Sequence, residues 1–357
     1  MAEPEQQNLK AIDFFCSAGG MSAGLSNAGI IVLGGIDNDP SCRATYEANI
    51  AGAKFIKHDV ATLSAPELGR RFALERGDDS LVFAGCSPCQ FWTKIQTDKT
   101  KAEQTAFLLK HFQKFIGYFQ PGFVIVENVP GLYTSKEKSI LPTFIQFLEL
   151  HGYACKDGII NANDYGVPQN RKRYLLIATR LTTTIDLPKA EPNPLLTVRS
   201  SIGVQNGFEA IAAGHRDDTE FQHTASSLSP ANLRRIQLTA KSGGTREAWK
   251  DDNELQIAAY RGRDEIFRDV YGRMFWDRPA PTITTRFNSF SNGRFGHPEE
   301  DRAISIREGA TLQTFPKDFV FHGTNKNNVA RQIGNAVPPE LARRIGQHLI
   351  SIASHNG

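Results

Sequence analysis

Residues 81–93 read Leu-Val-Phe-Ala-Gly-Cys-Ser-Pro-Cys-Gln-Phe-Trp-Thr. The first four are apolar, as in a buried strand of a parallel sheet, and Gly85 begins the turn that ends such a strand. Cys89 therefore follows the carboxyl end of a strand, which is the edge of an open α/β sheet where ligands and catalytic groups collect. This stretch predicts an α/β fold with a thiol at the ligand-binding edge of its sheet.

The spacing of Cys86 and Cys89 leaves other interpretations open. Zinc needs two further ligands at matching spacing, but Cys16, Cys42 and Cys155 are scattered singly, so we expect no metal site. A thioredoxin-like redox pair also follows a strand and carries proline between its cysteines. Two buried thiols that act as small hydrophobic residues are the simplest alternative. None of these explains the residues that follow the second cysteine.

The composition is that of an ordinary globular protein. A chain of 357 residues with 40% apolar content is long enough for a large α/β domain and a smaller one. Its net charge of +3 is too small to indicate a polyanionic partner, so nucleic-acid binding has to be argued from local patches. We see no secretion leader and no apolar run of membrane-spanning length. We therefore expect a cytosolic protein whose five cysteines stay reduced.

The amino-terminal part alternates predicted strands, turns and helices. Residues 9–15 read as a strand, residues 16–20 as a turn of small residues and residues 21–28 as a helix. Small residues let a ligand approach the backbone, and the helix offers free N–H groups, although a turn without a ligand explains the pattern as well. Residues 30–36 form a second strand before Asp37, where a carboxylate can hold ribose hydroxyls or cap a helix.

Further predicted strands lead to residues suited to chemistry. Residues 55–60 read as a strand that contains Asp59, and residues 122–127 read as a buried strand that ends in Glu127. A carboxylate at such an end is placed to take part in a reaction, unless it only caps a turn. Arg171 and Arg173 alternate before another strand, so in extended backbone they point to one side, as they also would on a solvated face.

The pattern changes after Leu181. Prolines between residues 188 and 194 read as a linker, and roughly eighty residues then lack the strand and helix rhythm of the first part. Basic, glycine and hydroxyl groups gather at residues 234–235, 241–246 and 261–263, a composition that suits base edges and phosphates. An amphipathic helix at residues 340–351 closes the chain and on its own indicates only packing.

Taken together, three motifs resemble those of the bacterial restriction-modification type of DNA cytosine-5 methyltransferases. They are Pro88-Cys89-Gln90-x-Trp92-Thr93, Glu127-Asn128-Val129 and Gln169-x-Arg171-x-Arg173. Segments 13–25, 278–285, 307–316 and 332–339 match the same family in order, so that the resemblance runs from Ala11 to about Leu349. One departure is Ser17, where the family usually has glycine; serine is small enough to keep the turn.

The resemblance implies a doubly wound, Rossmann-like methyltransferase domain with a smaller inserted target-recognition domain. We expect the catalytic and cofactor-binding domain at residues 1–188, the recognition domain at 189–326, and a returning segment at 327–357. The cofactor implied is S-adenosylmethionine, with S-adenosylhomocysteine as the product. By resemblance, Phe15 would lie against the adenine, Asp37 at the ribose, Asp59 at the adenine amino group, and Asn335 and Val337 at the methionine end. The other expected cofactor contacts are Ser17, Gly19, Gly20, Asn38, Val60 and Pro88.

The catalytic roles that the resemblance implies fall on four residues. The Cys89 thiolate would add to C6 of a cytosine flipped out of duplex DNA, because stacking shields C6 inside the duplex. Glu127 would contact N3 and the amino group of the base, and Arg173 would brace Glu127. Arg171 would help hold the base and the substrate backbone.

Double-stranded DNA is the implied partner. Gln90 would occupy space near the vacated base, Lys94 would meet phosphates, and Arg246 is a further candidate for DNA contact. We expect a monomer without membrane attachment, associated with the nucleoid in a prokaryotic cytoplasm. A cognate restriction endonuclease that acts separately is compatible with this family.

Other functions stay open at this point. A silent DNA-binding module could keep the fold, although the intact catalytic residues argue against it. A redox or nicotinamide enzyme would use Cys86 and Cys89 instead, and the cofactor that shifts the melting temperature would distinguish it. Transfer-RNA methylation by a family relative is the nearest rival, but the insert between Leu181 and Tyr271 favours DNA.

Overall fold

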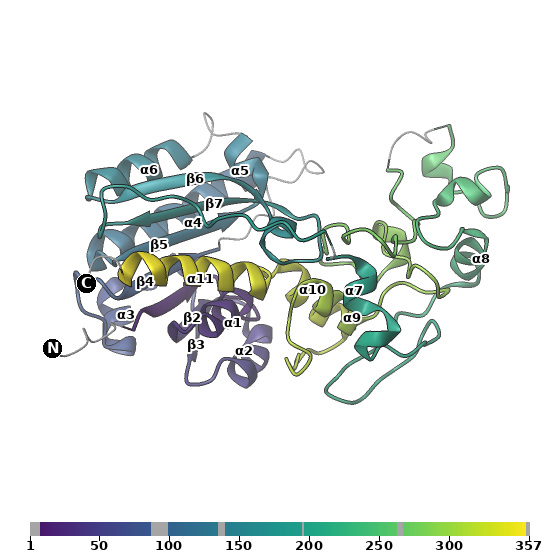
Figure 1. Ribbon diagram of the computed structural model, residues 1–357, viewed down its shortest axis with the longest axis horizontal. Coiled ribbons are helices and arrows are strands. Elements are labelled where there is room, and N and C mark those ends of the chain that lie inside the picture. The colour runs from purple at the N-terminus through teal and green to yellow at the C-terminus, as the bar shows by residue number, and fades with distance from the viewer. Residues whose placement is uncertain (1–7, 87–98, 135–139, 195, 263–266, 355–357) are drawn as a thin grey trace. The chain divides into compact units, whose positions relative to one another are not determined.

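The computed structural model describes residues 8–86, 99–134, 140–194, 196–262 and 267–354, and for residues 99–107 only the backbone (Figure 1). The chain divides into two compact units. Unit 1 comprises Met1–Tyr165, Lys172–Glu191 and Val337–Gly357, and unit 2 comprises Gly166–Arg171 and Pro192–Ala336. These bounds differ from the expected 1–188, 189–326 and 327–357 mainly because residues 166–171 pack with unit 2, which continues to Ala336. Which unit carries which function stays a prediction.

Unit 1 is built on a sheet of seven strands within the described residues, in the order β3-β2-β1-β4-β5-β7-β6. The strands are β1 (Lys10–Phe14), β2 (Ile31–Asp37), β3 (Lys54–Lys57), β4 (Leu81–Gly85), β5 (Phe123–Asn128), β6 (Ala154–Asn161) and β7 (Lys172–Thr179). The first five are parallel neighbours, whereas β7 runs antiparallel to both β5 and β6. An α/β sheet with buried central strands is the arrangement that residues 81–84 predicted.

The sheet has a switch point between β1 and β4. From β1 the chain winds outward through β2 and β3, and it then returns to place β4 on the other side of β1. Connections that leave adjacent strands in opposite directions open a crevice beyond the carboxyl ends, which is where open α/β sheets bind ligands. The segments after Phe14 and Gly85 therefore leave the sheet at its switch point, and Cys86 N donates to Phe14 O at 3.3 Å.

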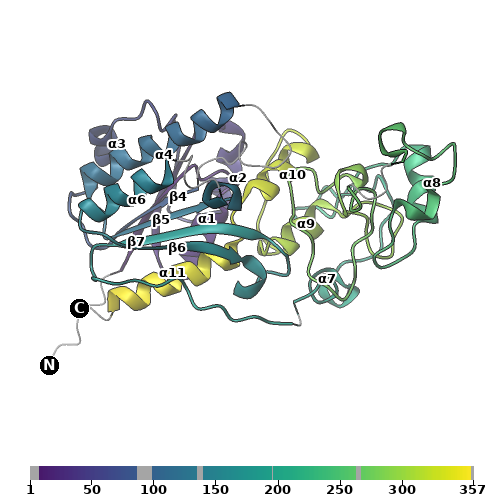
Figure 2. The ribbon, with the colours of Figure 1, turned by 90° about the horizontal axis from the view of Figure 1, so that it is seen from above.

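Helices cover both faces of this sheet (Figure 2). The helices of unit 1 are α1 (Gly20–Asn27), α2 (Arg43–Asn49), α3 (Ala65–Phe72), α4 (Lys99–Phe119), α5 (Pro130–Thr134), α6 (Leu141–Leu150) and α11 (Pro339–Ser354). Helices α3, α4 and α6 lie on the face opposite to α11 (Figure 2). The core beneath α4 is aromatic, with the ring of Phe14 at 5.1 Å from Phe83 and 5.0 Å from Phe112. Such edge-to-face pairs add to the stabilisation that burial alone provides.

The carboxyl-terminal helix returns to the first part of the chain. Helix α11 packs along α1, and Gly24 of α1 lies so close to α11 that an added Cβ would overlap Pro339 O and Ala342 Cβ. The sequence predicted this helix at residues 340–351, and in the structure it begins one residue earlier and ends three residues later. None of the described helices is both long and apolar enough to span a membrane.

Unit 2 contains short helices joined by long irregular segments. Its helices are α7 (Val198–Ile202), α8 (Pro230–Leu238), α9 (Ile306–Leu312) and α10 (Lys326–Asn335), and its described residues form isolated bridges rather than strands. This confirms the prediction that strands and helices no longer alternate after Leu181. Such a fold has many buried carbonyl groups that no sheet or helix satisfies.

Buried arginines satisfy many of those carbonyls. Arg273, Arg302 and Arg307 are each 0% exposed. Arg273 donates to the carbonyls of Ile236, Thr239, His297 and Glu300, and Arg307 donates to those of Glu220, Phe221, Pro316 and Phe319. A guanidinium carries five N–H donors in a rigid fork, so one side chain can join several loops. Burial lowers the pKa of Arg307 to about 10, which still leaves it charged at neutral pH.

Several expected elements are confirmed and others were missed. The strands expected near residues 9–15, 30–36, 81–84 and 122–127, the strand expected after Arg173 and the helix expected near residues 21–28 are present with small shifts. The expected strand at 55–60 ends earlier, at Lys57. Helices α3 and α6 and strand β6 were not predicted; β6 has no simple alternation of buried and exposed positions. It is an edge strand beside β7, so its pairing is set by the sheet.

Candidate active site

The loop between β1 and α1 has a strained backbone. Phe15 and Ser17 adopt φ values of 62° and 47°, and Gly19 has a φ of 89°. Left-handed conformations cost a non-glycine residue on the order of 1–3 kcal/mol and are concentrated at ligand sites. A side chain at Gly19 would also meet the Tyr46 ring at 3.0 Å. The loop therefore keeps a fixed path close to the end of β1, and Ser17 accommodates the turn.

A chain of hydrogen bonds through buried side chains lies beside this loop and supports it. Asp13 is 0% exposed, and its Oδ2 accepts from Ser22 Oγ at 2.7 Å. Since the serine proton is used there, Tyr46 OH donates to Ser22 Oγ across 2.9 Å. Burial, the largest cause, raises the pKa of Asp13 to about 7, and hydrogen bonds from Ser22 oppose that shift. Asp13, Ser22 and Tyr46 were not predicted to have a role, although an aspartate inside the otherwise apolar strand Lys10–Phe14 is a sign of one.

Asp37 lies at the carboxyl end of β2 and joins that strand to the loop. Its Oδ2 accepts from Ser17 N at 2.9 Å and its Oδ1 accepts from Asp39 N at 2.9 Å. Burial raises the pKa of Asp37, and the backbone hydrogen bonds oppose that shift. A carboxylate has about four acceptor sites, so both oxygens can still accept from a ligand. The neighbouring Asn38 is exposed.

The turn after β3 lies beside the end of β2. His58 N donates to Asp37 O at 3.0 Å, which brings the next residues toward Asp37. Asp59 is exposed, and its Oδ1 accepts from Ala61 N at 2.8 Å, while Val60 is 2% exposed. Phe15, Asp37 and Asp59 therefore lie at or just after the carboxyl ends of β1, β2 and β3.

The pair of Glu127 and Arg173 lies at the ends of β5 and β7. Glu127 faces Leu175 in the antiparallel register, so Arg173 is its diagonal neighbour on the same face of the sheet. Arg173 Nε is 3.0 Å from Glu127 Oε1, and the two side chains are 11% and 7% exposed. Despite this ion pair, Glu127 Oε1 accepts no hydrogen bond within the described part of the chain. Arg173 also donates to Lys172 O at 2.8 Å.

Two cysteines of the described segments, Cys16 and Cys42, are buried thiols. Cys16 and Cys42 are 5% and 3% exposed, and burial raises the pKa of both, that of Cys42 to about 11. Burial raises the pKa of Cys155 to about 12, and neither Cys155 nor Cys86 forms a disulfide within the described residues. Cys89, together with Pro88, Gln90 and Lys94, lies outside the described residues, so its role stays a prediction.

The other predicted site residues are divided between the units. In unit 2, the Arg171 side chain is buried, whereas Asn335 ends helix α10 with an exposed side chain. Arg246, also in unit 2, is 5% exposed and lies over the Tyr260 ring at 4.2 Å. Val337 begins the last segment of unit 1 and is 4% exposed. Their functional roles stay predictions.

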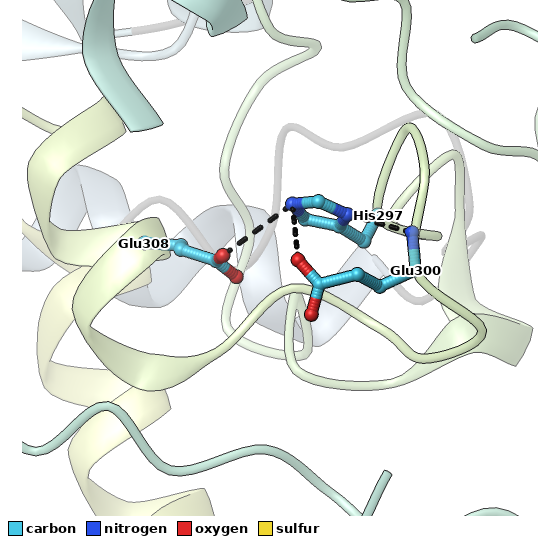
Figure 3. A group of neighbouring side chains, drawn as sticks. All are labelled: His297, Glu300 and Glu308. Atoms are coloured by element: carbon cyan, nitrogen blue, oxygen red, sulfur yellow. Dashed lines mark hydrogen bonds and ion pairs between the residues drawn. The ribbon is translucent and has the colours of Figure 1, made fainter. Parts of the chain in front are cut away.

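One group of potential metal ligands occurs in the described segments. His297, Glu300 and Glu308 of unit 2 have ligand atoms within 4.8 Å of one another (Figure 3). His297 Nδ1 accepts from Glu300 N at 2.9 Å, and burial lowers the pKa of His297 to about 4. The neutral ring therefore carries its proton on Nε2, the atom that faces both carboxylates (Figure 3). Arg302 binds Glu308 through two hydrogen bonds of 2.7 and 2.8 Å, so this group is an internal ionic cluster.

The strand order and the helices on both faces of the sheet define the class of fold, a Rossmann-like α/β fold. A protein described as a DNA modification methyltransferase from an E. coli prophage superposes with a TM-score of 0.74 at 23% identity, covering 97% of this chain and 100% of that one. The S. pombe Dnmt2 methyltransferase gives a TM-score of 0.59 at 16% identity, covering 96% and 98%. These two similarities show the fold.

Sequence comparison identifies the family within that class. The family model for C-5 cytosine-specific DNA methylase matches residues 9–351. The Type II methylase M.HgiDII of Herpetosiphon aurantiacus is 40% identical over 344 residues, 95% of this chain and 94% of that protein. The Type II methyltransferase M1.HphI of Haemophilus parahaemolyticus is 30% identical over 97% of this chain and 87% of its own. The chain belongs to the C-5 cytosine-specific DNA methylases, and the resemblance stated from the motifs is confirmed.

Proposed function

We propose that this chain transfers the methyl group of S-adenosylmethionine to C5 of a flipped cytosine in a specific duplex DNA sequence. The observation that carries the proposal is the carboxyl group of Glu127. It is buried and paired in charge with Arg173, yet its Oε1 accepts no hydrogen bond from the described residues. A buried polar atom without a hydrogen bond is costly, so a substrate that brings a donor is favoured there.

Cytosine carries the complementary groups. Its exocyclic amino group can donate to a carboxylate, and its N3 gains a proton as electron density enters the ring. A carboxyl group that binds these atoms more strongly as the charge develops lowers the barrier of the reaction. Arg173 would keep the Glu127 side chain in the orientation that this contact needs. The target must first leave the duplex, because the stacked bases shield its edge and C6.

Cys89 would supply the nucleophile. C5 of cytosine is a weak nucleophile. Addition of the Cys89 thiolate to C6 would make C5 more nucleophilic, because the S–C6 bond forms and the π electrons move toward C5. C5 would then take the electrophilic methyl group that a bound S-adenosylmethionine supplies: the C5–methyl bond forms as the sulfur–methyl bond breaks, and the sulfur keeps the bonding pair in S-adenosylhomocysteine. The C5 proton then leaves to a solvent base, the C5–C6 double bond forms again, and the thiolate of Cys89 is expelled.

The loops of unit 1 fit this cofactor by their chemistry. The strained turn at Phe15 and Ser17 places the backbone close to a ligand, and helix α1 begins at Gly20 without a side-chain cap, so its N–H groups suit the methionine carboxylate. Asp37 keeps acceptor sites that suit ribose hydroxyls. The proposed contacts are Phe15, Ser17, Gly19, Gly20, Asp37, Asn38, Asp59, Val60, Pro88, Asn335 and Val337.

The substrate proposed is duplex DNA, read by residues 189–326. Gln90, Lys94 and Arg246 are the proposed contacts with it. The Type II relatives support a role beside a separate restriction endonuclease that cuts the same sequence. We further propose that the protein acts as a monomer on the DNA of a prokaryotic nucleoid.

A covalent trap tests this mechanism. If fluorine replaces hydrogen at C5 of the target cytosine, methyl transfer can proceed, but the last elimination has no proton to remove. With S-adenosylmethionine present, we expect an adduct with this DNA that survives denaturation and maps to Cys89 by peptide analysis. Cys89→Ser should abolish the adduct, because a serine hydroxyl is scarcely ionised at neutral pH.

Cys86→Ser is the matched control, because it removes the other thiol of the same pair and should leave the adduct intact. An adduct at Cys86 would contradict the proposed nucleophile. So would the absence of any adduct on DNA that the protein demonstrably methylates.

A further inference from the structure

The end of helix α10 is held by side chains from distant parts of unit 2. Arg171 donates through Nη2 to Gly334 O at 3.2 Å and to Ala336 O at 3.1 Å. Gln313 donates through Nε2 to Ile333 O at 2.7 Å and to Ala336 O at 3.3 Å. Carbonyls in the last turn of a helix have no partner within the helix, and a cation there also favours the negative end of the helix dipole.

These contacts enclose one residue. The carbonyls of Gly334 and Ala336 lie on either side of Asn335, whose own side chain is exposed. On the other side, Arg171 Nη1 donates to Ile283 O at 2.9 Å, and an added Cβ at Gly334 would overlap Thr284. The backbone at Asn335 is therefore fixed by the guanidinium, by Gln313 and by the segment that contains Ile283.

A chain of hydrogen bonds through Gln169 orients the side chain of Gln313. Ile283 N donates to Gln169 Oε1 at 2.8 Å, and Gln169 Nε2 donates to Gln313 Oε1 at 2.7 Å and to Leu312 O at 3.1 Å. Because its oxygen is engaged by Gln169, the amide of Gln313 must turn its N–H groups toward α10. Gln169 and Gln313 are each 0% exposed, and Arg171 is 2% exposed. Segments 169–171, 278–285 and 307–316 thus meet segment 332–339 at the carboxyl end of helix α10.

We propose that Arg171 and Gln313 are positioning residues for Asn335, so that Arg171 contributes to the reaction by setting cofactor affinity rather than by holding the target base. This inference rests on the proposed function, in which Asn335 contacts the methionine end of the cofactor. The resemblance implied that Arg171 holds the target base, whereas we assign it to Asn335 because its Nη1 and Nη2 atoms donate to main-chain carbonyls on both sides of that residue and at Ile283.

The test measures binding of S-adenosylhomocysteine by calorimetry without DNA, in the full-length chain. Arg171→Lys keeps the charge but loses the guanidinium fork, which donates to three main-chain carbonyls. Gln313→Glu keeps the shape but turns a carboxylate oxygen toward the carbonyls of Ile333 and Ala336. We expect each to weaken binding by about tenfold, as the loss of one good hydrogen bond to a positioned group would. Arg331→Lys, on an exposed position of the same helix, should bind as the parent does.

Coupling to Asn335 separates positioning from a merely structural role. Asn335→Ala should itself weaken binding, and Arg171→Lys should then add little in the Asn335→Ala background, because residues that act through one contact are not additive. When the concentration of S-adenosylmethionine is varied, Arg171→Lys should raise KM for it and largely retain kcat, the rate at saturating cofactor.

Two results would overturn the inference. One is that both variants bind S-adenosylhomocysteine as the parent does but lose most of kcat, which would indicate that Arg171 acts on the target base. The other is an equal loss of affinity with and without Asn335, which would mean a general loosening of unit 2. By contrast, a parent chain that does not bind S-adenosylhomocysteine at all would refute the proposed function.

Discussion

Glu127 and Arg173 meet because of strand register. They lie 46 positions apart in the sequence, and the antiparallel pairing of β5 with β7 makes them diagonal neighbours. The alternation that turns Arg173 inward turns Lys172 outward, and Lys172 is exposed. The sequence indicated that Arg171 and Arg173 share a side, but the structure gives them different partners in different units.

Arg173→Met should therefore be far more damaging than Lys172→Met. Removing one member of a nearly buried ion pair leaves an uncompensated charge, with a typical cost of about 3–5 kcal/mol. We expect a lower melting temperature and a single-turnover rate of methyl transfer reduced by at least about a hundredfold, while Lys172→Met retains both. Equal behaviour of the two variants in scanning fluorimetry and in the methylation assay would refute the assigned role.

Asp13 should make stability depend on pH. Its pKa rises from 3.8 in the unfolded chain to about 7 in the folded one. Between these values the folded chain holds a proton that the unfolded chain releases, so this contribution is complete below pH 3.8 and is lost as the pH rises to about 7. Asp13→Asn should remove that slope, and its melting temperature relative to the parent should rise from pH 5 to pH 7.5.

Ser22→Ala is the matched comparison for Asp13→Asn. It retains the carboxyl group and removes a hydrogen bond that lowers the pKa of Asp13, so the pH-dependent slope should persist and extend to higher pH. If the Asp13→Asn variant follows the same melting-temperature profile as the parent, Asp13 does not titrate in this range.

At the scale of elements, a substitution of Gly24 at the contact of α1 with α11 would change the stability of the protein in two opposing ways. Alanine is a better helix former than glycine by about 1 kcal/mol, but an added Cβ would overlap Pro339 O and Ala342 Cβ in the facing helix. Overpacking of this kind typically costs about 1–3 kcal/mol, and here the obstacle includes backbone, so the clash should win.

Gly24→Ala should thus lower the melting temperature, whereas Ser26→Ala should change it little or raise it slightly. Ser26 is exposed on the same helix, so only the propensity difference applies to it. Scanning calorimetry of both variants checks this. A stabilised Gly24→Ala protein would show that α11 can withdraw from α1 without cost.

At the scale of the whole molecule, the frame of unit 2 is separate from its variable segments. Arg273 binds the main-chain carbonyls of Ile236 and Thr239, and carbonyls are present whatever the local sequence. The frame around α10 is supplied by residues 166–171 and 283–336. Replacing residues 192–271 by the matching segment of a relative should therefore preserve both the fold and the affinity for S-adenosylhomocysteine.

The same exchange should change the DNA sequence that is methylated, because direct base contacts specify sequence while the catalytic residues lie outside the exchanged segment. Bisulfite sequencing of DNA from cells that express the chimaera reports activity and target together. An unchanged methylation pattern would locate recognition outside residues 192–271.

Much of this protein was determined by sequence alone. The apolar runs before Asp37, Gly85 and Glu127 predicted buried strands, because a parallel sheet covered on both faces leaves no polar positions within them. The motifs identified the family, since chemistry at a strand end requires particular side chains at particular spacings. Helix α11 was visible from its amphipathic period, which local sequence determines.

Only the tertiary structure decided which distant groups meet. Register places Arg173 beside Glu127, and packing places Arg171 and Gln313 at the carbonyls around Asn335. Asp13 likewise gained its raised pKa from burial beneath a loop whose path Tyr46 fixes. In unit 2, where regular periods are absent, buried arginines join the loops through carbonyl groups. Carbonyls leave no mark in the sequence, because every residue has one, and so these contacts could be found only once the chain had folded.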